Sequence, residues 1–293
     1  MKPLEIAVLM GGTSKEREIS LQSGREVVKA LLKAGARVAE VDVRDEHFCV
    51  PPSTDVVFVA LHGTFGEDGQ VQRILEERGV AYTGSGPEAS GRAFNKNAAK
   101  QVFRVAGIPT PKAAYSPPLV AKPARQGSSV GVTIVRHESE LAGALAEAKR
   151  YDENVIVEQL IEGREFTVGI LGGRALPVVE IRTNRKFFDY EAKYTPGAAD
   201  EICPAPIDAM TSSQMQHWAR HAHECLGCRD FSRVDVMWNG KGEFFVLEVN
   251  TIPGLTANSL LPKAARAAGL NIETLCVRMV EMALERRLEK AVA

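Results

Sequence analysis

The stretch IAVLMGGTS, residues 6–14, is an apolar run that stops at two glycines and two hydroxyl-bearing residues. A helical pattern follows, and its apolar residues recur on one face until Gly35 (Leu21, Val27, Val28, Leu31 and Leu32). Residues 36–43 form a second strand candidate. Residues 56–61 form a third, which is continuously apolar, as in a strand covered on both faces. Strands that alternate with helices predict an α/β fold with a parallel sheet and helices on both sides.

The remainder of the chain is richer in predicted strands. We expect helices over residues 70–78, 97–105, 138–149, 212–226 and 272–288, and strands over residues 119–122, 130–135, 154–158, 166–171, 227–238 and 243–249. The last helix carries an apolar stripe that should face a core (Ile272, Leu275, Met279, Val280, Ala283 and Leu284).

Composition narrows the class of protein. The chain has 293 residues and a formal net charge of −1, which removes the main electrostatic reason to expect nucleic acid or an acidic membrane as partner. No apolar run approaches the ~20 residues that span a bilayer, and the run at 6–10 is too short for a signal-peptide core. Five cysteines are an odd and sparse set for a disulfide framework, so we expect a reduced, cytoplasmic protein.

Two predicted strands near the C-terminal end carry a cluster of polar side chains. Alternate side chains share one face of a strand, so Arg233 and Asp235 point the same way, as do Glu248 and Asn250. A hairpin-type turn at residues 239–242 separates the strands, and pairing them would bring the four side chains together. Oxygen ligands of this kind are those that Mg2+ prefers. A solvated polar face is the alternative, although the apolar neighbours of these residues indicate partial burial.

Lys122 is followed by a segment of mostly small residues, RQGSSVG at 125–131. Backbone N–H groups in such a segment can approach an anion, and Lys122 could supply the charge for a phosphate. Taken alone, the segment fits an ordinary hairpin turn better.

A third cluster holds potential soft metal ligands on the helix predicted over 212–226 and just after it (His217, His221, His223, Cys225 and Cys228). A structural zinc site needs four ligands in one geometry, whereas these residues lie at differing angles along one helix. A surface helix that ends in a buried cysteine is the better interpretation. A zinc-binding or redox module is the alternative hypothesis.

Taken together, these segments resemble the D-alanine–D-alanine ligases of the ATP-grasp superfamily, in that family's order from residue 8 to about residue 268. The shared landmarks are GGTSKEREIS (11–20), LHG (61–63), GEDG (66–69), YTGSG (82–86), KP (122–123), GSSVG (127–131), EFTV (165–168), YEAKY (190–194), RVD (233–235) and EVNTIPGLT (248–256). The resemblance implies a three-domain ATP-grasp architecture. A Rossmann-like N-terminal domain with a parallel sheet (1–95) would precede a central lobe (96–178) and a C-terminal lobe (179–293), two α+β lobes that hold ATP between them.

The resemblance also implies a reaction, the ligation of two D-alanines for peptidoglycan synthesis. ATP phosphorylates the carboxylate of the first D-alanine, and the amine of the second attacks the acyl phosphate. The residues that match the family's ATP contacts are Lys96, Lys122, Ser128, Ser129, Glu158, Glu165 and Lys193. Asp235, Glu248 and Asn250 match the ligands of two Mg2+ (or Mn2+) ions. Arg233 matches the residue that stabilises the transferring phosphate and the developing oxyanion.

The amino-acid site follows from the same resemblance. Glu16 matches the carboxylate that holds the ammonium of the first D-alanine. Ser259 and Leu260 match a helix N-terminus that receives the carboxylate of the second. His62 and Gly254, together with Arg233, complete the implied substrate-binding set.

A loop that closes over the site is implied at Lys193 and Tyr194. The residues that match Glu16, Ser128 and Tyr194 are hydrogen-bonded in the closed state of the family, and with Arg233 they form the implied catalytic set. Closure excludes water, which would hydrolyse the acyl phosphate. A tyrosine at residue 194 goes with an amine as second substrate, so we expect D-alanyl-D-alanine as the product.

Two further expectations come from the resemblance. Only residues 115–118 separate two strands between which relatives carry a longer segment, so the central lobe should be small at that edge. A homodimer is implied as well. The alternative is another ATP-grasp carboxylate–amine ligase, of the biotin-carboxylase or glutathione-synthetase type, which would lack Glu16, Tyr194 and Ser259.

Overall fold

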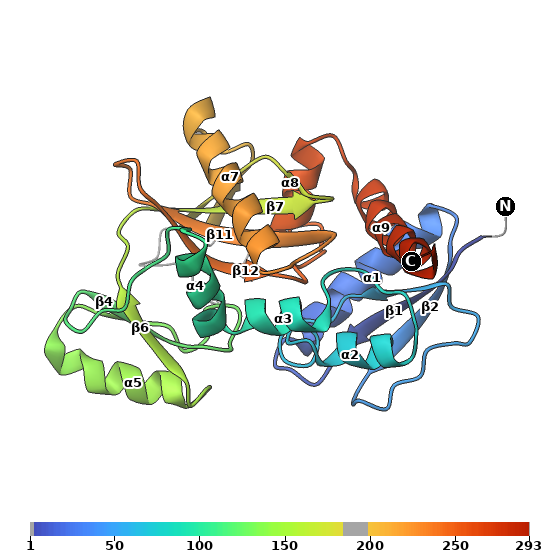
Figure 1. Cartoon of the computed structure of the whole chain (residues 1–293), viewed down its shortest axis with the longest axis horizontal. Helices are drawn as coiled ribbons and strands as arrows, with labels where there is room; N and C mark the ends of the chain where they lie inside the picture. The colour runs from blue at the N-terminus through green and yellow to red at the C-terminus, as the bar shows by residue number, and fades with distance from the viewer. Residues whose placement is uncertain (1–2, 184–198, 293) are drawn as a thin grey trace.

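The computed structural model describes residues 3–183 and 199–292 (Figure 1). The first of its three sheets is parallel, with strand order β2-β1-β3. These strands are β1 (Glu5–Gly11), β2 (Arg37–Val43) and β3 (Val56–Val59), as the sequence predicts. Two helices of this region are α1 (Arg17–Lys33) and α2 (Gln70–Glu77).

Strand β1 is apolar throughout because both of its faces are buried in cores. Ile6, Val8 and Met10 belong to one core, shared with α1. Ala7 and Leu9 belong to a second core, shared with α2. Side chains alternate between the faces of a strand, so a strand covered on both sides needs apolar residues at every position. One expectation for α1 is wrong, since Leu32 is 53% exposed and lies off the buried face.

The second sheet is antiparallel, with strand order β5-β4-β6. It comprises β4 (Leu119–Pro123), β5 (Thr133–Val135) and β6 (Val155–Gln159), beside the short 3-10 helix η1 (Glu138–Glu140) and α5 (Leu141–Lys149). Its core is small, and its buried members are Leu119, Ala121, Val135 and Ala144. Residues 115–118 directly precede β4, and the expectation that this edge is smaller than in relatives stays a prediction.

The third sheet is antiparallel, with strand order β10-β9-β7-β11-β12 and β8 paired to β7. Its strands are β7 (Arg164–Leu171), β8 (Arg174–Ala175), β9 (Val179–Thr183), β10 (Ala199–Ile202), β11 (Phe231–Trp238) and β12 (Phe244–Asn250). The expected boundary at residue 178 divides this sheet, because β7 and β8 precede it. Local pattern predicted β7, β11 and β12 but not β8, β9 and β10, and β7 pairs with β11, which is distant in sequence.

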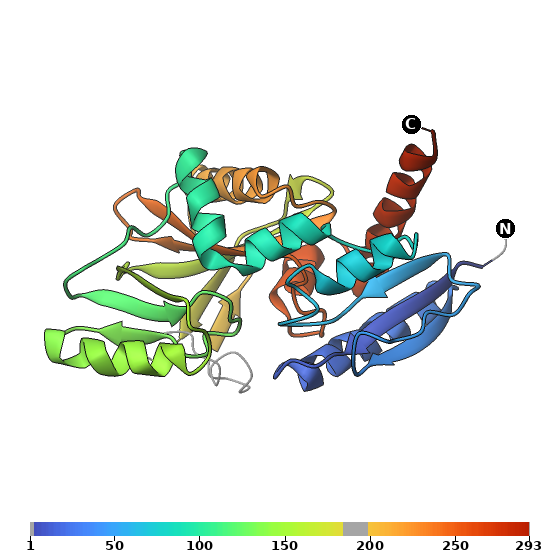
Figure 2. The same cartoon turned by 60° about the horizontal axis from the view of Figure 1, so that its bottom comes forward.

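The remaining helices connect and cover the sheets. They are α3 (Pro87–Phe94), α4 (Lys96–Val105), α7 (Ala209–Cys225), α8 (Leu260–Ala267) and α9 (Ile272–Val292). Helices α3 and α4 follow one another between the parallel sheet and the rest of the molecule (Figure 2). Helix α4 begins where the Asn95 side chain accepts hydrogen bonds from the N–H groups of Asn97 and Ala98.

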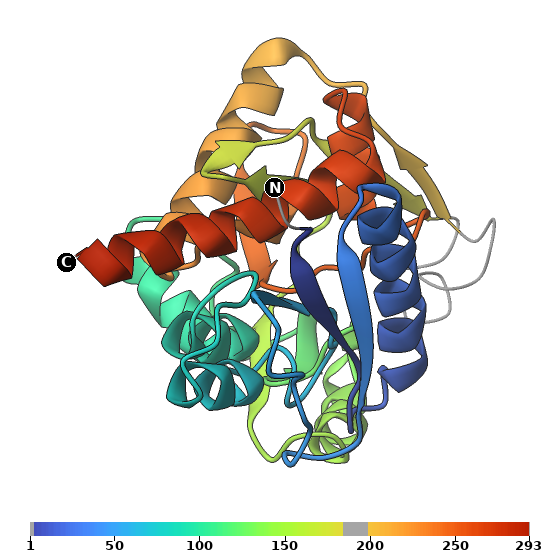
Figure 3. The ribbon, with the colours of Figure 1, turned by 90° about the vertical axis from the view of Figure 1, so that its right-hand side faces the viewer.

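Helix α9 packs on the N-terminal domain although it ends the chain. Figure 3 shows it running across the parallel sheet next to α1. The predicted stripe is confirmed, since Leu275, Met279 and Val280 are buried in the core that α1 and β1 share. The segment expected as a C-terminal lobe, 179–293, therefore returns to the first domain with its last helix. An apolar stripe predicts that a helix is covered, but not by which domain.

Candidate active site

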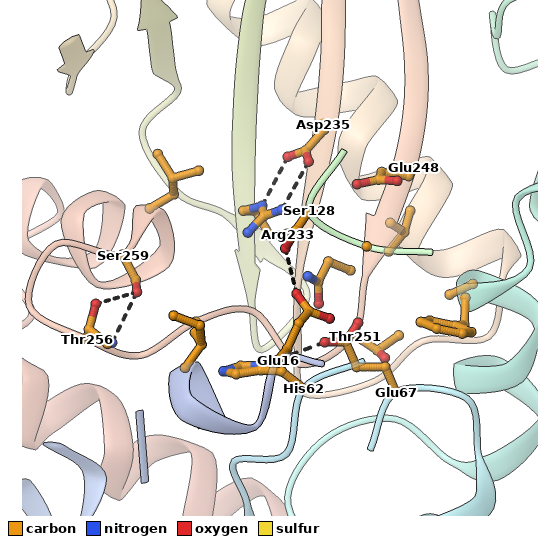
Figure 4. Close-up of a pocket in the computed structure, with 18 of the residues that line it drawn as sticks. Glu16, His62, Glu67, Ser128, Arg233, Asp235, Glu248, Thr251, Thr256 and Ser259 are labelled. Carbon is orange, nitrogen blue, oxygen red and sulfur yellow. Dashed lines mark hydrogen bonds and ion pairs between the residues drawn. The ribbon is translucent and has the colours of Figure 1, made fainter. Parts of the chain in front are cut away.

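A cavity of about 490 Å3 lies between the N-terminal domain, the segment that joins β4 to β5, and the third sheet (Figure 4). Most of the predicted site residues line it: Glu16, His62, Lys96, Ser128, Glu165, Arg233, Asp235, Glu248, Asn250, Gly254, Ser259 and Leu260. These residues come from segments up to 244 positions apart, between Glu16 and Leu260 (260 − 16 = 244). The tertiary structure thus gathers them as the sequence landmarks predict.

The other predicted residues lie elsewhere. Lys122 and Glu158 are not part of the cavity wall and instead pair with each other, with 2.5 Å between Nζ and Oε1. Ser129 follows Ser128 but does not line the cavity. Lys193 and Tyr194 lie outside the residues that the structure describes, so their predicted role as a closing loop stays a prediction.

Arg233 is held rigidly by Asp235. Its Nε and Nη2 each donate to a different carboxylate oxygen, both at 3.0 Å, and Thr167 donates to Asp235 Oδ1 at 2.6 Å. Burial alone would lower the pKa of Arg233, but the carboxylate of Asp235 outweighs burial and raises the pKa above its ordinary value. The guanidinium therefore stays charged and points in one direction at the cavity, as a preorganised electrostatic group requires.

The predicted pairing of the two strands that carry the predicted metal ligands is confirmed. Strands β11 and β12 pair Asp235 with Glu248 and Arg233 with Asn250. Two carboxylates and an amide oxygen are a donor set that suits Mg2+. In the described part of the chain, no three or more His, Cys, Asp and Glu side chains are grouped so that they could hold a metal. The set formed by Asp235, Glu248 and Asn250 is not such a group, because it contains only two carboxylates.

Cations of the protein already contact this donor set. Lys96 Nζ lies 2.9 Å from Glu248 Oε2, and it also donates to the carbonyl oxygen of Gln126 at 2.6 Å. Asn250 Oδ1 accepts a hydrogen bond from the N–H of Ile252 at 2.9 Å. The residues therefore fit a hard cation by chemistry, and in this structure the side chains of Lys96 and Arg233 supply positive charge to the two carboxylates.

Glu16 and Ser128 join two parts of the molecule across the cavity. Ser128 Oγ donates to Glu16 Oε1 at 2.5 Å, and Figure 4 shows the two side chains pointing toward each other. Glycines leave room for the carboxylate, since a Cβ on Gly63 would lie 2.7 Å from Glu16 Oε2 and one on Gly127 would lie 3.3 Å from it. The contact predicted for Glu16 and Ser128 in a closed site is thus present.

The segment from Gly127 to Gly131 is more than an ordinary turn. It does join two antiparallel strands, β4 and β5, as a hairpin connection would. However, Ser128 and Ser129 have φ values of 54° and 58°, in the left-handed region that side chains rarely adopt. Such conformations cost roughly 1–3 kcal/mol each and gather at functional sites. The backbone strain at these serines coincides with the hydrogen bond to Glu16.

His62 lies in the cavity wall with both ring nitrogens engaged. Nδ1 donates to the carbonyl oxygen of Ile252 at 3.0 Å, because a carbonyl can only accept. Nε2 lies 3.0 Å from Ser23 Oγ, and the N–H of Leu255 donates to the same hydroxyl at 3.3 Å. The histidine therefore links α1 to the loop after β12. Because both ring nitrogens of His62 are engaged, its predicted contact with substrate would involve the face of the ring or would require these contacts to break.

Glu67 is a carboxylate of the cavity that the sequence analysis placed only within a landmark. It is 8% exposed; its Oε1 accepts from the N–H of Gly63 at 3.0 Å and lies 3.5 Å from His62 Nδ1. Burial raises the pKa of Glu67, and the contact with His62 opposes that shift. A glutamate in a polar loop gives no local signal of burial, which arises from the tertiary structure around the cavity.

The N-terminus of α8 forms the far end of the cavity. Ser259 is its N-cap residue, but the hydroxyl is held by Thr256, whose N–H lies 3.1 Å and whose Oγ1 lies 2.8 Å from Ser259 Oγ. The first N–H groups of a helix attract anions. The predicted carboxylate site at Ser259 and Leu260 therefore faces the same space as Glu16 and Arg233.

The zinc hypothesis for residues 217–228 has no support in the structure. All five of its residues are described, and no metal-binding group forms among the described residues. His223 is buried, and its Nδ1 lies 2.7 Å from Ser232 Oγ. Burial lowers the pKa of His223 to about 4. The histidine is thus a core residue. The expectation that this helix ends in a buried cysteine is wrong, because Cys225 and Cys228 are half-buried.

This buried histidine predicts a loss of stability in acid. Unfolding returns the pKa of His223 from about 4 to about 6.5, so the unfolded state binds more protons between these pH values. The contribution of neutral, buried His223 to the free energy of unfolding is fully present above pH 6.5. It decreases by on the order of 3 kcal/mol as the pH falls toward 4. In urea titrations from pH 7.5 to 4.5, His223→Gln should flatten the decline of the unfolding midpoint. His217→Gln, on the exposed side of α7, should retain the full decline.

Comparisons with known proteins agree with this site. The family model described as "D-ala D-ala ligase C-terminus" matches residues 98–281, and that described as "D-ala D-ala ligase N-terminus" matches residues 46–85. A D-alanine–D-alanine ligase of Methylacidiphilum infernorum is 45% identical, covering 97% of each chain. Among the described residues no helix has the length and apolarity to cross a membrane.

Solved structures give the same result. A D-alanine–D-alanine ligase from Bacillus anthracis complexed with ATP superposes with a TM-score of 0.86 at 34% identity, over 99% of this chain and all of that one. The VanG D-Ala:D-Ser ligase from Enterococcus faecalis superposes with a TM-score of 0.85 at 29% identity, over 96% of this chain. The chain belongs to the D-alanine–D-alanine ligase family.

Proposed function

We propose that this chain joins two D-alanines into D-alanyl-D-alanine at the expense of ATP, and so supplies a peptidoglycan precursor. One observation carries the proposal. A single cavity is lined by the carboxylate of Glu16, which could bind an ammonium, by the guanidinium of Arg233, which Asp235 holds in place, and by the helix N-terminus at Ser259. Family membership and the ATP complex of the Bacillus anthracis relative support the same reaction.

The two substrates would enter with complementary charges. The ammonium of the first D-alanine binds Glu16, which leaves its carboxylate free to attack the γ-phosphorus of ATP and release ADP. The carboxylate of the second D-alanine binds the N–H groups at Ser259 and Leu260, which presents its amine to the acyl phosphate. The C–N bond forms as phosphate leaves. Arg233 faces the charge that develops on the phosphoryl and acyl oxygens.

The metal ligands and the nucleotide contacts belong to this proposal. Asp235, Glu248 and Asn250 would hold two Mg2+ or Mn2+ ions, which neutralise phosphate charge and orient it for transfer. Further residues would contact ATP. Two of them, Glu165 and Lys96, line the cavity; three lie outside its wall, namely Lys122, Ser129 and Glu158. Another is Lys193.

The Ser128–Glu16 hydrogen bond supports a closed state of the site. It ties the β4–β5 segment to the N-terminal domain and covers the cavity from one side. Excluding water protects an acyl phosphate from hydrolysis. We propose that Tyr194 adds to this cover. We also propose a cytoplasmic homodimer, which light scattering tests as twice the 31.8 kDa chain mass.

Phosphate release from ATP tests substrate class and stereochemistry together. We expect release with D-alanine and none above background with L-alanine. Glu16 would hold the ammonium of the first amino acid and the N-terminus of α8 the carboxylate of the second, so an L-amino acid held by the same group would point its methyl group or its reacting group the wrong way. Product analysis with D-alanine alone, and with D-alanine plus D-lactate, tests the second substrate. Preferential formation of the depsipeptide at neutral pH would contradict the assignment. Equal release with both enantiomers would favour another ATP-grasp ligase.

A further inference from the structure

A buried lysine outside the predicted site contacts one of the predicted nucleotide residues. Lys100, on α4, is 1% exposed. Its Nζ lies 2.8 Å from Glu158 Oε2 and donates to Thr110 Oγ1 at 2.9 Å. A fully buried ammonium is rare unless it is paired, so its partners indicate what it stabilises.

Glu158 lies between two lysines. Lys100 contacts one of its carboxylate oxygens at 2.8 Å and Lys122 the other at 2.5 Å. Burial opposes the charge of this carboxylate, but the ammonium groups of Lys122 and Lys100 outweigh burial and lower the pKa of Glu158. The same environment acts on the lysine: burial and the neighbouring Lys122 lower the pKa of Lys100 to about 8. The three side chains form a buried cluster with one excess positive charge.

The two lysines are not equivalent in position. Lys122 lies on β4, directly before the Gly127–Gly131 segment that the nucleotide phosphates would approach. Neither lysine lines the cavity, but Lys100 is more deeply buried, at 1% exposed against 8% for Lys122. When ATP phosphates attract Lys122, its contact with Glu158 weakens. A buried carboxylate that loses its partner is strongly destabilised, so a second cation is needed there.

Lys100 is also tied to the strand that carries predicted metal ligands. Thr110 Oγ1, which accepts from Lys100, donates to the carbonyl oxygen of Val246 at 2.8 Å. The N–H of Val246 donates in turn to the carbonyl oxygen of Pro109, also at 2.8 Å. Val246 lies on β12, two residues before Glu248. One chain of contacts thus joins Glu158 on β6, Lys100 on α4 and β12.

We propose that Lys100 is a positioning residue for nucleotide binding, which keeps Glu158 ionised and in place while ATP phosphates engage Lys122. The proposal rests on the proposed function for the identity of the nucleotide. Lys100 acts through Glu158 and touches neither substrate. It therefore governs affinity for ATP rather than the chemical steps at Arg233.

Calorimetric titration of the full chain with ATP and Mg2+ tests this role directly. Lys100→Met, which keeps the length of the side chain but removes its charge, should weaken ATP binding about 10- to 100-fold, the range for losing a charged hydrogen-bond partner. KM for ATP should rise by a similar factor, whereas KM for D-alanine and kcat at saturating ATP should change less than about 3-fold. Arg104→Met, an exposed cation on the same helix, should leave ATP binding unchanged.

A double variant separates positioning from a merely structural role. If Lys100 acts through Glu158, adding Lys100→Met to Glu158→Gln should change ATP binding by less than about 3-fold. Additive losses, or a fall in kcat with unchanged ATP affinity, would overturn the proposal. If Lys100→Met does not fold, Lys100→Gln replaces it with the same expected result. Because ATP binding needs no amino acid, a parent chain that binds ATP but ignores D-alanine would refute the proposed function and leave this test valid.

Discussion

Arg233→Ala should lower kcat at least about 10^3-fold while KM for ATP rises less than about 5-fold, because the guanidinium acts on charge that develops only in the transition state. The bidentate contact with Asp235 fixes this group before substrate arrives. Steady-state kinetics at saturating D-alanine measure both parameters. Equal effects on kcat and KM would indicate simple nucleotide binding instead.

Stability must be measured beside this activity. Removing Arg233 breaks its buried pair with Asp235, although the hydroxyl of Thr167 still donates to the carboxylate. Breaking a buried pair typically costs about 3–5 kcal/mol. Arg233→Lys is the matched control, since it keeps a positive charge but loses the planar bidentate geometry. We expect a kcat between those of the parent and Arg233→Ala. If thermal unfolding shows that a variant is fully folded and the variant is nevertheless inactive, the loss of activity is due to the chemical step and not to unfolding.

Glu16→Gln should have the second largest effect, about a 10^2- to 10^3-fold fall in kcat/KM for the first D-alanine. The amide keeps the shape of the side chain but removes the charge that would bind an ammonium. It also weakens the contact with Ser128, now a charge-assisted hydrogen bond of 2.5 Å. The dependence of phosphate release on D-alanine concentration gives this value.

Glu18→Gln is a close control for this substitution. Glu18 lies two residues further along, in the first turn of α1, and is exposed. The same change of charge at this position should leave kcat/KM within about 2-fold of the parent. Similar losses in both variants would mean that the general charge of this helix end, and not Glu16 itself, binds the amino acid.

The sequence by itself determined those features that depend on local periodicity. Continuous apolar runs predicted the buried strands β1 and β3, and the alternation of residues predicted that Asp235 faces Glu248 across a hairpin. The order of motifs predicted a set of site residues, most of which line the cavity, including Glu16 and Ser259. These features are readable because the side chains that share a face recur at fixed spacing along one segment.

The tertiary structure alone decided which segments meet and which charges are buried. Strand β7 joins the third sheet through pairing with β11, and α9 returns to the N-terminal core. Lys100 and Glu67 are both buried in the folded chain. Lys100 pairs with Glu158, which is far along the chain, and Glu67 accepts a hydrogen bond from the N–H of Gly63 across a turn. No local pattern records this, because the energy of a buried charge depends on neighbours supplied by other elements of the fold.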